Sequence, residues 1–213
     1  MLQKQDSDTV DRISTTVGLA PATIRRHLDI LQRDQLVAYN EIRKKTGRPK
    51  HSFYLTELGQ ETLPKHYDTL LGMVVRELAG LTVDDTREKN GQDILELVFA
   101  NLSEDVVDRS SVAPSNDNMA QRLDGLLNHL QKEDFYPDAV VENTGLEIRL
   151  HNCPFRSVAL QNEAVCALDL NIISSTLGFD VTRSECITEE GATCCVYTAE
   201  IPLQLREELA TTT

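Results

Sequence analysis

The chain has 213 residues, of which 40% are hydrophobic and 26% charged, a composition typical of globular proteins rather than of disordered or fibrous ones. No apolar run approaches the roughly 18 residues that span a bilayer, and the first residues lack the apolar stretch of a signal peptide, so we expect a cytoplasmic protein with no membrane partner. The net charge of −13, taken alone, argues against nucleic acid as a partner.

The charge is distributed unevenly along the chain. Residues 1–55 contain ten Lys and Arg against six Asp and Glu, a net charge of +4. The remaining residues contain eleven against twenty-eight, a net charge of −17. This asymmetry predicts a basic binding module joined to an acidic body.

The first predicted elements are two short helices joined by a sharp turn. One helix is expected over residues 8–17, because Val10, Ile13 and Val17 would share one face. Gly18 permits the turn that ends it, and a second helix follows Pro21 over residues 22–34. The side chains expected to face outward from the second helix, toward a DNA groove, include Thr23, Arg25, Arg26 and Arg33. This order predicts a helix-turn-helix.

A basic β-hairpin is expected next. Residues 36–42 and 51–55 have strand character and flank a tip rich in Lys and Arg. Such a wing can neutralise phosphates of the DNA backbone, and the side chains expected to do so are Lys44, Lys45, Arg48 and Lys50. Helix-turn-helix look-alikes occur in helical bundles, and basic hairpin tips are often only solvated. Both features in the correct order favour a winged helix-turn-helix that binds double-stranded DNA.

One element of a winged helix is missing from this pattern. A further helix normally precedes the first one described, yet only Met1 to Gln5 stand there. Leu2 resembles the last apolar residue of such a helix. We therefore expect either a true start upstream of Met1 or a module whose core is closed by a partner.

The middle of the chain is predicted to be helical. Thr56 can cap a short helix, and Pro64 opens a longer one that reaches about Leu81. The apolar stripe of the longer helix comprises Leu70, Leu71, Val74, Val75 and Leu78. This stripe could pack in the core, but a homodimer seam is favoured, because regulators of this kind usually bind two half-sites. Residues 83–91 are the best linker candidate.

The predicted organisation has three parts. Residues 1–62 form the winged helix-turn-helix domain, residues 63–91 the helix and linker, and residues 92–213 the C-terminal domain. In that last part, two amphipathic helices precede a hairpin over 140–150, a helix over 165–177 ended by Gly178, and a second hairpin over 181–201. The expected fold class is α+β.

All five cysteines lie in the C-terminal part, with the spacing C-x12-C-x19-C-x7-C-C. Because no CxxC pair is present, zinc-finger and ferredoxin templates fail, and any metal site must be assembled from separate elements. A two-residue turn at Glu190-Gly191 would place Cys186 opposite Cys195 and point Cys194 to the other face. The side chains thus nominated as ligands are Cys153, Cys166, Cys186 and Cys195, and a one-residue slip would exchange Cys194 for Cys195.

Two alternatives to a metal site stay open at this point. Cysteine is among the most buried residue types, so Cys166 could simply be core. A Cys186–Cys195 pair could instead form a redox-sensitive disulfide. An enzyme is not expected, because no paired histidine and carboxylate can be identified and the five histidines are scattered.

Two groups of motifs resemble SufR-type regulators, over nearly the whole chain from about Thr9 to Ile201. One is Gly47-Arg48-Pro49-Lys50 followed by Tyr54-Leu55-Thr56-Glu57-Leu58-Gly59. The other is Cys153-Pro154-Phe155, Cys166 and the ending Gly191-x-x-x-Cys195-x-Tyr197. These regulators are DNA-binding repressors of SUF iron–sulfur cluster assembly genes.

The resemblance implies a homodimeric repressor with a winged helix and a C-terminal iron–sulfur cluster, usually [4Fe–4S]. It implies Cys153, Cys166 and Cys195 as ligands, with Cys194 as the alternate for the last, whereas Cys186 is supported less directly. The expected mechanism is that cluster occupancy sets DNA affinity. The alternative is a winged-helix regulator that senses oxidants through a cysteine disulfide without a metal.

Overall fold

The computed structural model describes residues 2, 7–42, 49–109, 118–142, 145–189, 192–203 and 205. The chain divides into two compact units, Met1–Pro64 and Lys65–Thr213. The fold is mixed α+β with two small sheets, as the sequence predicts at that level. The second unit includes residues 65–91 of the segment expected to form a helix and linker.

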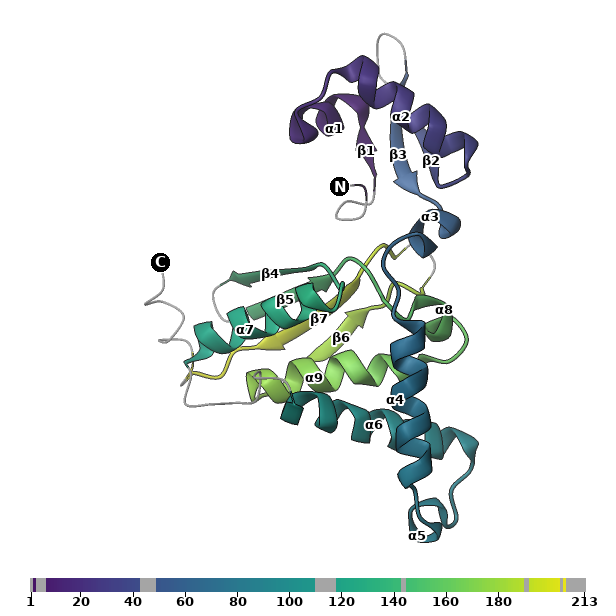
Figure 1. Cartoon of the computed structure of the whole chain (residues 1–213). Helices are drawn as coiled ribbons and strands as arrows, with labels where there is room; N and C mark the ends of the chain where they lie inside the picture. Colours follow the sequence, from purple (N-terminus) through teal and green to yellow (C-terminus); the bar gives the residue numbers. More distant parts are fainter. Residues whose placement is uncertain are drawn as a thin grey trace. The chain divides into compact units, whose positions relative to one another are not determined.

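The first unit combines helices with a three-stranded sheet. Its elements are β1 (Asp8–Thr9), α1 (Val10–Val17), α2 (Pro21–Arg33), β2 (Val37–Ile42), β3 (Lys50–Leu55) and α3 (Glu57–Glu61). The antiparallel sheet has the order β1-β3-β2 (Figure 1). The core cluster of this unit consists of Ile13, Ile24, Leu28, Val37 and Phe53.

Local chemistry explains where α1 begins and ends. The helix expected from Asp8 starts instead at Val10, because Asp8 and Thr9 pair with β3. Extended Thr9 caps the helix by accepting a hydrogen bond from the Arg12 N–H, and Gly18 ends it with a φ of 73°. Of the three residues expected to share one face, Ile13 is buried, whereas Val17, in the last turn next to Gly18, is 48% exposed.

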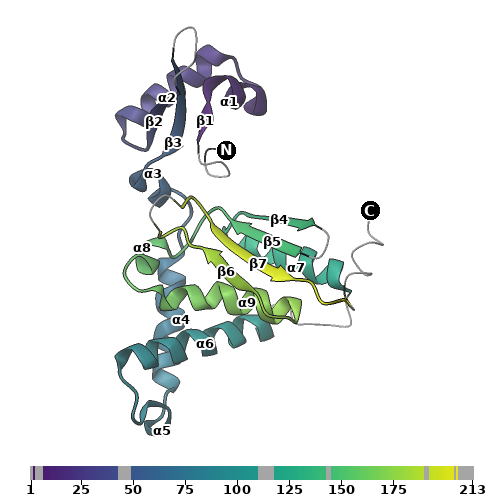
Figure 2. The same ribbon diagram turned by 180° about the vertical axis from the view of Figure 1, so that it is seen from behind.

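The second unit packs helices against a four-stranded antiparallel sheet of order β4-β5-β7-β6. Its helices are α4 (Tyr67–Gly80), α5 (Val83–Thr86), α6 (Gly91–Arg109), α7 (Met119–Lys132), α8 (Arg156–Ala159), the 3-10 helix η1 (Glu163–Cys166) and α9 (Ala167–Leu177). Its strands are β4 (Pro137–Glu142), β5 (Gly145–Leu150), β6 (Thr182–Glu185) and β7 (Cys195–Glu200). Figures 1 and 2 show α7 and α9 on one face of this sheet, and α6 packs on α9.

Strand periodicity decides which side chains reach the helices. Leu146, Ile148 and Leu150 alternate along β5 and are buried in the core of the second unit. The register pairs Ile148 with Tyr197 and Leu150 with Cys195, so these β7 side chains lie on the same covered face. The sheet therefore directs Cys195 and Tyr197 toward α9.

The apolar stripe of α4 divides between two environments. Leu70 is buried and Val74 packs against the core, whereas Leu71, Val75 and Leu78 are 63%, 56% and 45% exposed. The helix begins at Tyr67, three residues after the predicted start at Pro64. The segment predicted as a linker contains the short helix α5. Thr82 and Asp85 form a capping box at its N-terminus.

Candidate functional site

Four of the five cysteines line one buried cavity of the second unit, whose volume is about 10 Å³. Cys153 lies in the loop between β5 and α8, and Cys166 ends η1 and precedes α9. Cys186 follows the last residue of β6, and Cys195 is the first residue of β7. The fold thus brings together the four side chains that the sequence nominates, from four separate segments.

Strand pairing brings the last two of these thiols together. Thr182 pairs with Thr198 and Arg183 with Tyr197, and an irregularity then places Glu185 opposite Val196. Cys186 is therefore the next residue to meet Cys195, as the assumed register requires. The backbone N–H of Ile187 donates a hydrogen bond to the Cys195 sulfur over 3.3 Å. The predicted turn at Glu190-Gly191 lies outside the described residues.

The thiols interact with one another rather than only with apolar neighbours. Cys166 and Cys195 both hydrogen-bond the sulfur of Cys186, which lies 3.0 Å from the Thr188 hydroxyl. These hydrogen bonds lower the pKa of Cys186 and raise the pKa values of Cys166 and Cys195. Burial raises the pKa of the Cys153 thiol to about 12. The cluster accordingly favours a thiolate at Cys186, which is the form that attacks disulfides and binds metals.

A buried carboxylate that sequence reasoning missed faces the same cavity. Asp169, on α9, lines the cavity, and its Oδ2 accepts a hydrogen bond of 2.6 Å from the Tyr197 hydroxyl. Burial raises the pKa of Asp169 to about 6, although the tyrosine hydrogen bond acts in the opposite direction. Its Oδ1 has no hydrogen-bond donor among the residues that the structure describes. The only sequence signal was that Asp169 is the single charged residue of α9.

Cys194 lies apart from this set. It is buried, but it does not line the cavity, and its charge interaction is with Arg149, whose side chain lies on the other face of β5 from Leu150. Cys194 lies in a bend directly before β7, whereas Cys195 is the first residue of that strand and pairs with Leu150 on the covered face. The structure thus places Cys195, rather than Cys194, with the other three thiols.

The donor set fits a thiolate-bound metal or cluster in its chemistry. Four sulfurs face one cavity, which matches the ligands that iron–sulfur clusters and tetrahedral zinc take in proteins. Within the described part of the chain, however, no three His, Cys, Asp or Glu side chains already have the spacing of a metal site. At about 10 Å³ the cavity holds one water-sized group, so a larger occupant requires the four segments to separate.

The first unit presents a second candidate surface on α2. Ile24 and Leu28 hold one side of this helix in the core. The four side chains expected to face a DNA groove are all exposed on the remaining surface: Thr23, Arg25, Arg26 and Arg33. Arg25 also lines a groove of about 700 Å³ between α2 and the β2–β3 hairpin, together with Asp29 and Gln32.

The hairpin side of this groove carries aromatic side chains that the sequence analysis did not single out. Tyr39 stacks on His51, with ring centroids 3.9 Å apart, and both residues line the groove. They are brought together because Tyr39 and His51 flank the paired residues Asn40 and Ser52 diagonally on adjacent strands. Planar side chains in such a position can contact sugars or bases.

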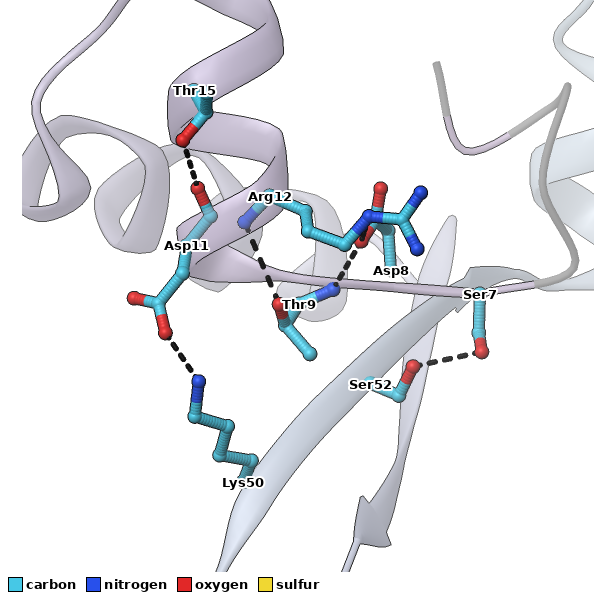
Figure 3. Close-up of polar contacts among 8 residues, drawn as sticks. All are labelled: Ser7, Asp8, Thr9, Asp11, Arg12, Thr15, Lys50 and Ser52. Carbon is cyan, nitrogen blue, oxygen red and sulfur yellow. Dashed lines mark hydrogen bonds and ion pairs between the residues drawn. The ribbon is translucent and has the colours of Figure 1, made fainter.

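Lys50, predicted to contact the DNA backbone, forms an ion pair in the first unit. Its Nζ lies 2.6 Å from Oδ2 of Asp11 on α1 (Figure 3). Both side chains are largely exposed, so this pair contributes little to stability and can exchange for a phosphate contact. The other three predicted wing contacts, Lys44, Lys45 and Arg48, lie outside the described residues.

Two further contacts involve the junction between β1 and α1. The Ser52 hydroxyl donates to the Ser7 hydroxyl over 2.7 Å, and Arg12 Nε lies 3.4 Å from Oδ1 of buried Asp8 (Figure 3). The first contact joins the residue before β1 to β3, and the second joins the first turn of α1 to β1.

Comparisons with family models, with curated proteins and with solved structures returned no match. Among the helices that the structure describes, none combines the length and apolar character needed to cross a bilayer.

Proposed function

We propose that this chain is a DNA-binding transcriptional repressor whose second unit binds an iron–sulfur cluster, most simply [4Fe–4S], and whose DNA affinity depends on cluster occupancy. The observation that carries the proposal is the convergence of Cys153, Cys166, Cys186 and Cys195 on one buried cavity from four separate segments. The resemblance to SufR-type regulators agrees with this arrangement and supplies the regulated genes, those of cluster assembly.

The first unit supports DNA binding through the order and chemistry of its elements. Two helices joined at Gly18 are followed by a hairpin, which is the order of a winged helix-turn-helix with α2 as recognition helix. We propose that Arg26 and Arg33 contact the major groove together with Thr23 and Arg25. Lys50 and the remaining wing cations then contact phosphates.

The second unit supports a sensor through its thiols. Cys153, Cys166, Cys186 and Cys195 would hold the cluster, with Cys186 already favoured as a thiolate by its two thiol neighbours. When bound, the cluster supplies a site that responds to iron supply and to oxidants. The residues of this chain contribute a water-poor cavity and four ligands whose segments must move together when the cavity widens. Because occupancy selects one arrangement of those segments, it can bias DNA affinity.

A homodimer follows from the geometry of operator binding. Two half-sites about one helical turn apart require two recognition helices. The exposed stripe of Leu71, Val75 and Leu78 on α4 provides an apolar strip at helical spacing. We place the dimer seam there.

The contacts within the thiol set favour a second candidate, an oxidant sensor without metal. Cys186 hydrogen-bonds both Cys166 and Cys195, and a thiolate next to a thiol is the arrangement from which disulfides form. This candidate predicts a disulfide that involves Cys186 and a colourless protein.

The first test is an anaerobic purification with iron, acid-labile sulfide and zinc counted per chain. Broad absorption near ~400 nm with equal iron and sulfide is expected. Cys195→Ser should lose both, whereas the neighbouring Cys194→Ser should keep them. A colourless protein that cannot be reconstituted, or one that carries zinc instead, contradicts the cluster.

DNA binding is tested separately, by selection from random duplexes of about 30 base pairs, long enough for two half-sites. Arg26→Ala should weaken binding to the selected duplex by about tenfold or more, since one base contact contributes ~1–3 kcal/mol. The matched control is Arg87→Ala, an exposed arginine of the second unit. Recovery of no enriched sequence, or equal binding by Arg26→Ala, contradicts the assignment of α2.

A further inference from the structure

The chain enters the second unit directly beside the Cys153 loop. Lys65 is the first residue of that unit, and the three residues Lys65, His66 and Tyr67 lead into α4. All three are hydrogen-bonded to the segment between β5 and the start of α8, which carries Cys153. This segment therefore lies against the residues that immediately follow the first unit in the sequence.

Three consecutive residues, 65 to 67, contact successive residues of the segment from Asn152 to Ser157. Lys65 Nζ donates to Oδ1 of Asn152 over 2.8 Å and to the carbonyl of Cys153 over 3.1 Å. The His66 N–H donates to the Pro154 carbonyl over 3.1 Å. The Ser157 N–H donates to the Tyr67 hydroxyl over 3.1 Å.

The far side of the loop is hydrogen-bonded to the turn that follows α7. Asn152 is 1% exposed, and its Nδ2 donates to the Asp134 carbonyl over 2.7 Å. His66 Nε2 lies 3.1 Å from Oδ2 of the same Asp134. The loop and residues 65–67, here called the entry segment, therefore belong to one hydrogen-bonded assembly. Neither can shift without loss of contacts to the other.

We propose that Lys65, His66 and Tyr67 transmit the state of the cysteine cavity to the first unit, with Lys65 and Tyr67 as positioning residues that act through the Cys153 loop. This inference rests on the proposed function, because it requires a cavity whose occupancy changes. The Cys153 side chain lines the cavity while its carbonyl accepts from Lys65. An occupant that moves the Cys153 segment away from the other three thiol segments thus displaces the Cys153 carbonyl, which is hydrogen-bonded to Lys65 of the entry segment.

The test compares DNA affinity of cluster-loaded and cluster-free full-length protein, with the duplex obtained by selection as probe. In the wild type, the ratio of the two dissociation constants measures the coupling, which typically amounts to about 5–150-fold. Lys65→Met keeps the aliphatic length and Tyr67→Phe keeps the ring, so both remove only polar contacts. The double variant should load iron and sulfide as the wild type does, yet reduce the ratio at least fivefold.

A second variant tests the same connection without touching these hydrogen bonds. Two glycines inserted between Pro64 and Lys65 leave every contact of the loop in place but loosen the covalent link to the first unit. The ratio should fall here as well. The controls are Lys89→Met and two glycines inserted between Lys89 and Asn90, in the exposed connection before α6, where the ratio should remain at the wild-type value.

The outcomes separate the two levels of the proposal. A wild type that binds no cluster, or whose loaded and cluster-free forms bind DNA equally, overturns the proposed function itself. A wild-type ratio that persists in the glycine insertion overturns the transmission through residues 65–67, whether or not the double variant folds. A ratio that falls in the insertion after Pro64 but not in the insertion after Lys89 supports it.

Discussion

The hydrogen bond between Tyr197 and Asp169 offers a direct test of how the candidate site is held together. Tyr197 is fully buried on β7, and its hydroxyl crosses from the sheet to α9, where it donates to the carboxylate over 2.6 Å. In Tyr197→Phe the ring stays in place and only the hydroxyl is lost. The carboxylate then loses its donor while its other oxygen, Oδ1, already has none among the described residues.

The size of the effect follows from this geometry. A hydrogen bond to a charged group contributes about 1.5–3 kcal/mol, and no solvent reaches the fully buried site to replace it. We therefore expect Tyr197→Phe to lower the free energy of unfolding by about 2 kcal/mol. With a urea dependence of about 2 kcal/mol per molar, the unfolding midpoint should fall by about 1 M.

The assay is urea unfolding of the full chain followed by circular dichroism, with reductant and chelator present so that metal occupancy does not contribute. Tyr54→Phe on β3 is the matched control, because the structure records no side-chain hydrogen bond from Tyr54 to any described residue. Adding Asp169→Asn to Tyr197→Phe should recover part of the loss, since a neutral amide is less costly to bury than a carboxylate. A free energy of unfolding for Tyr197→Phe within about 0.5 kcal/mol of that of the control would refute the reasoning.

Three further predictions concern the fold and assembly. Gly59→Ala should destabilise the first unit by about 2 kcal/mol or more, because the added Cβ would overlap the Leu36 carbonyl. The control Gly72→Ala has open space around the added Cβ and should be neutral or stabilising, so equal urea midpoints for the two variants would contradict this prediction. Half-burial lowers the pKa of His129, so the unfolded state binds more protons and stability should fall as pH drops below about 6.5; in His129→Gln this slope should become shallower, which thermal unfolding at several pH values would reveal. Leu71→Glu should convert a dimer to a monomer in sedimentation velocity, and an unchanged sedimentation coefficient would place the seam elsewhere.

Several features of the fold follow from local sequence alone. Gly18 and Gly178 end helices in the left-handed conformation that glycine adopts without strain, and Thr56 caps α3 through the Gly59 N–H. Strand character in the sequence predicted β2 to β7, whereas β1 was assigned to the first helix. The segregation of charge and cysteine between the two halves of the chain was also visible in the sequence, because it needs only counting.

Features that depend on what packs against an element could not be read in this way. The stripe on α4 is uniform in sequence, yet Leu70 is buried and Leu71 is exposed, because only one side of the helix meets the core. Asp169 is the single charged residue of α9, and nothing local indicates that Tyr197, 28 residues further on, donates a hydrogen bond to it. The loop contacts of Lys65 join residues almost ninety positions apart.

By itself, then, the sequence predicted the order of the longer helices and of the two hairpins of the second unit, and a set of thiols that no local motif could hold. Only the tertiary structure decided which of Cys194 and Cys195 joins that set, since one residue of strand register exchanges the two faces of a sheet. The register of a strand depends on which long-range pairing buries the most apolar surface. The alternative registers differ in their packing across the whole unit, so neighbouring residues do not determine the outcome.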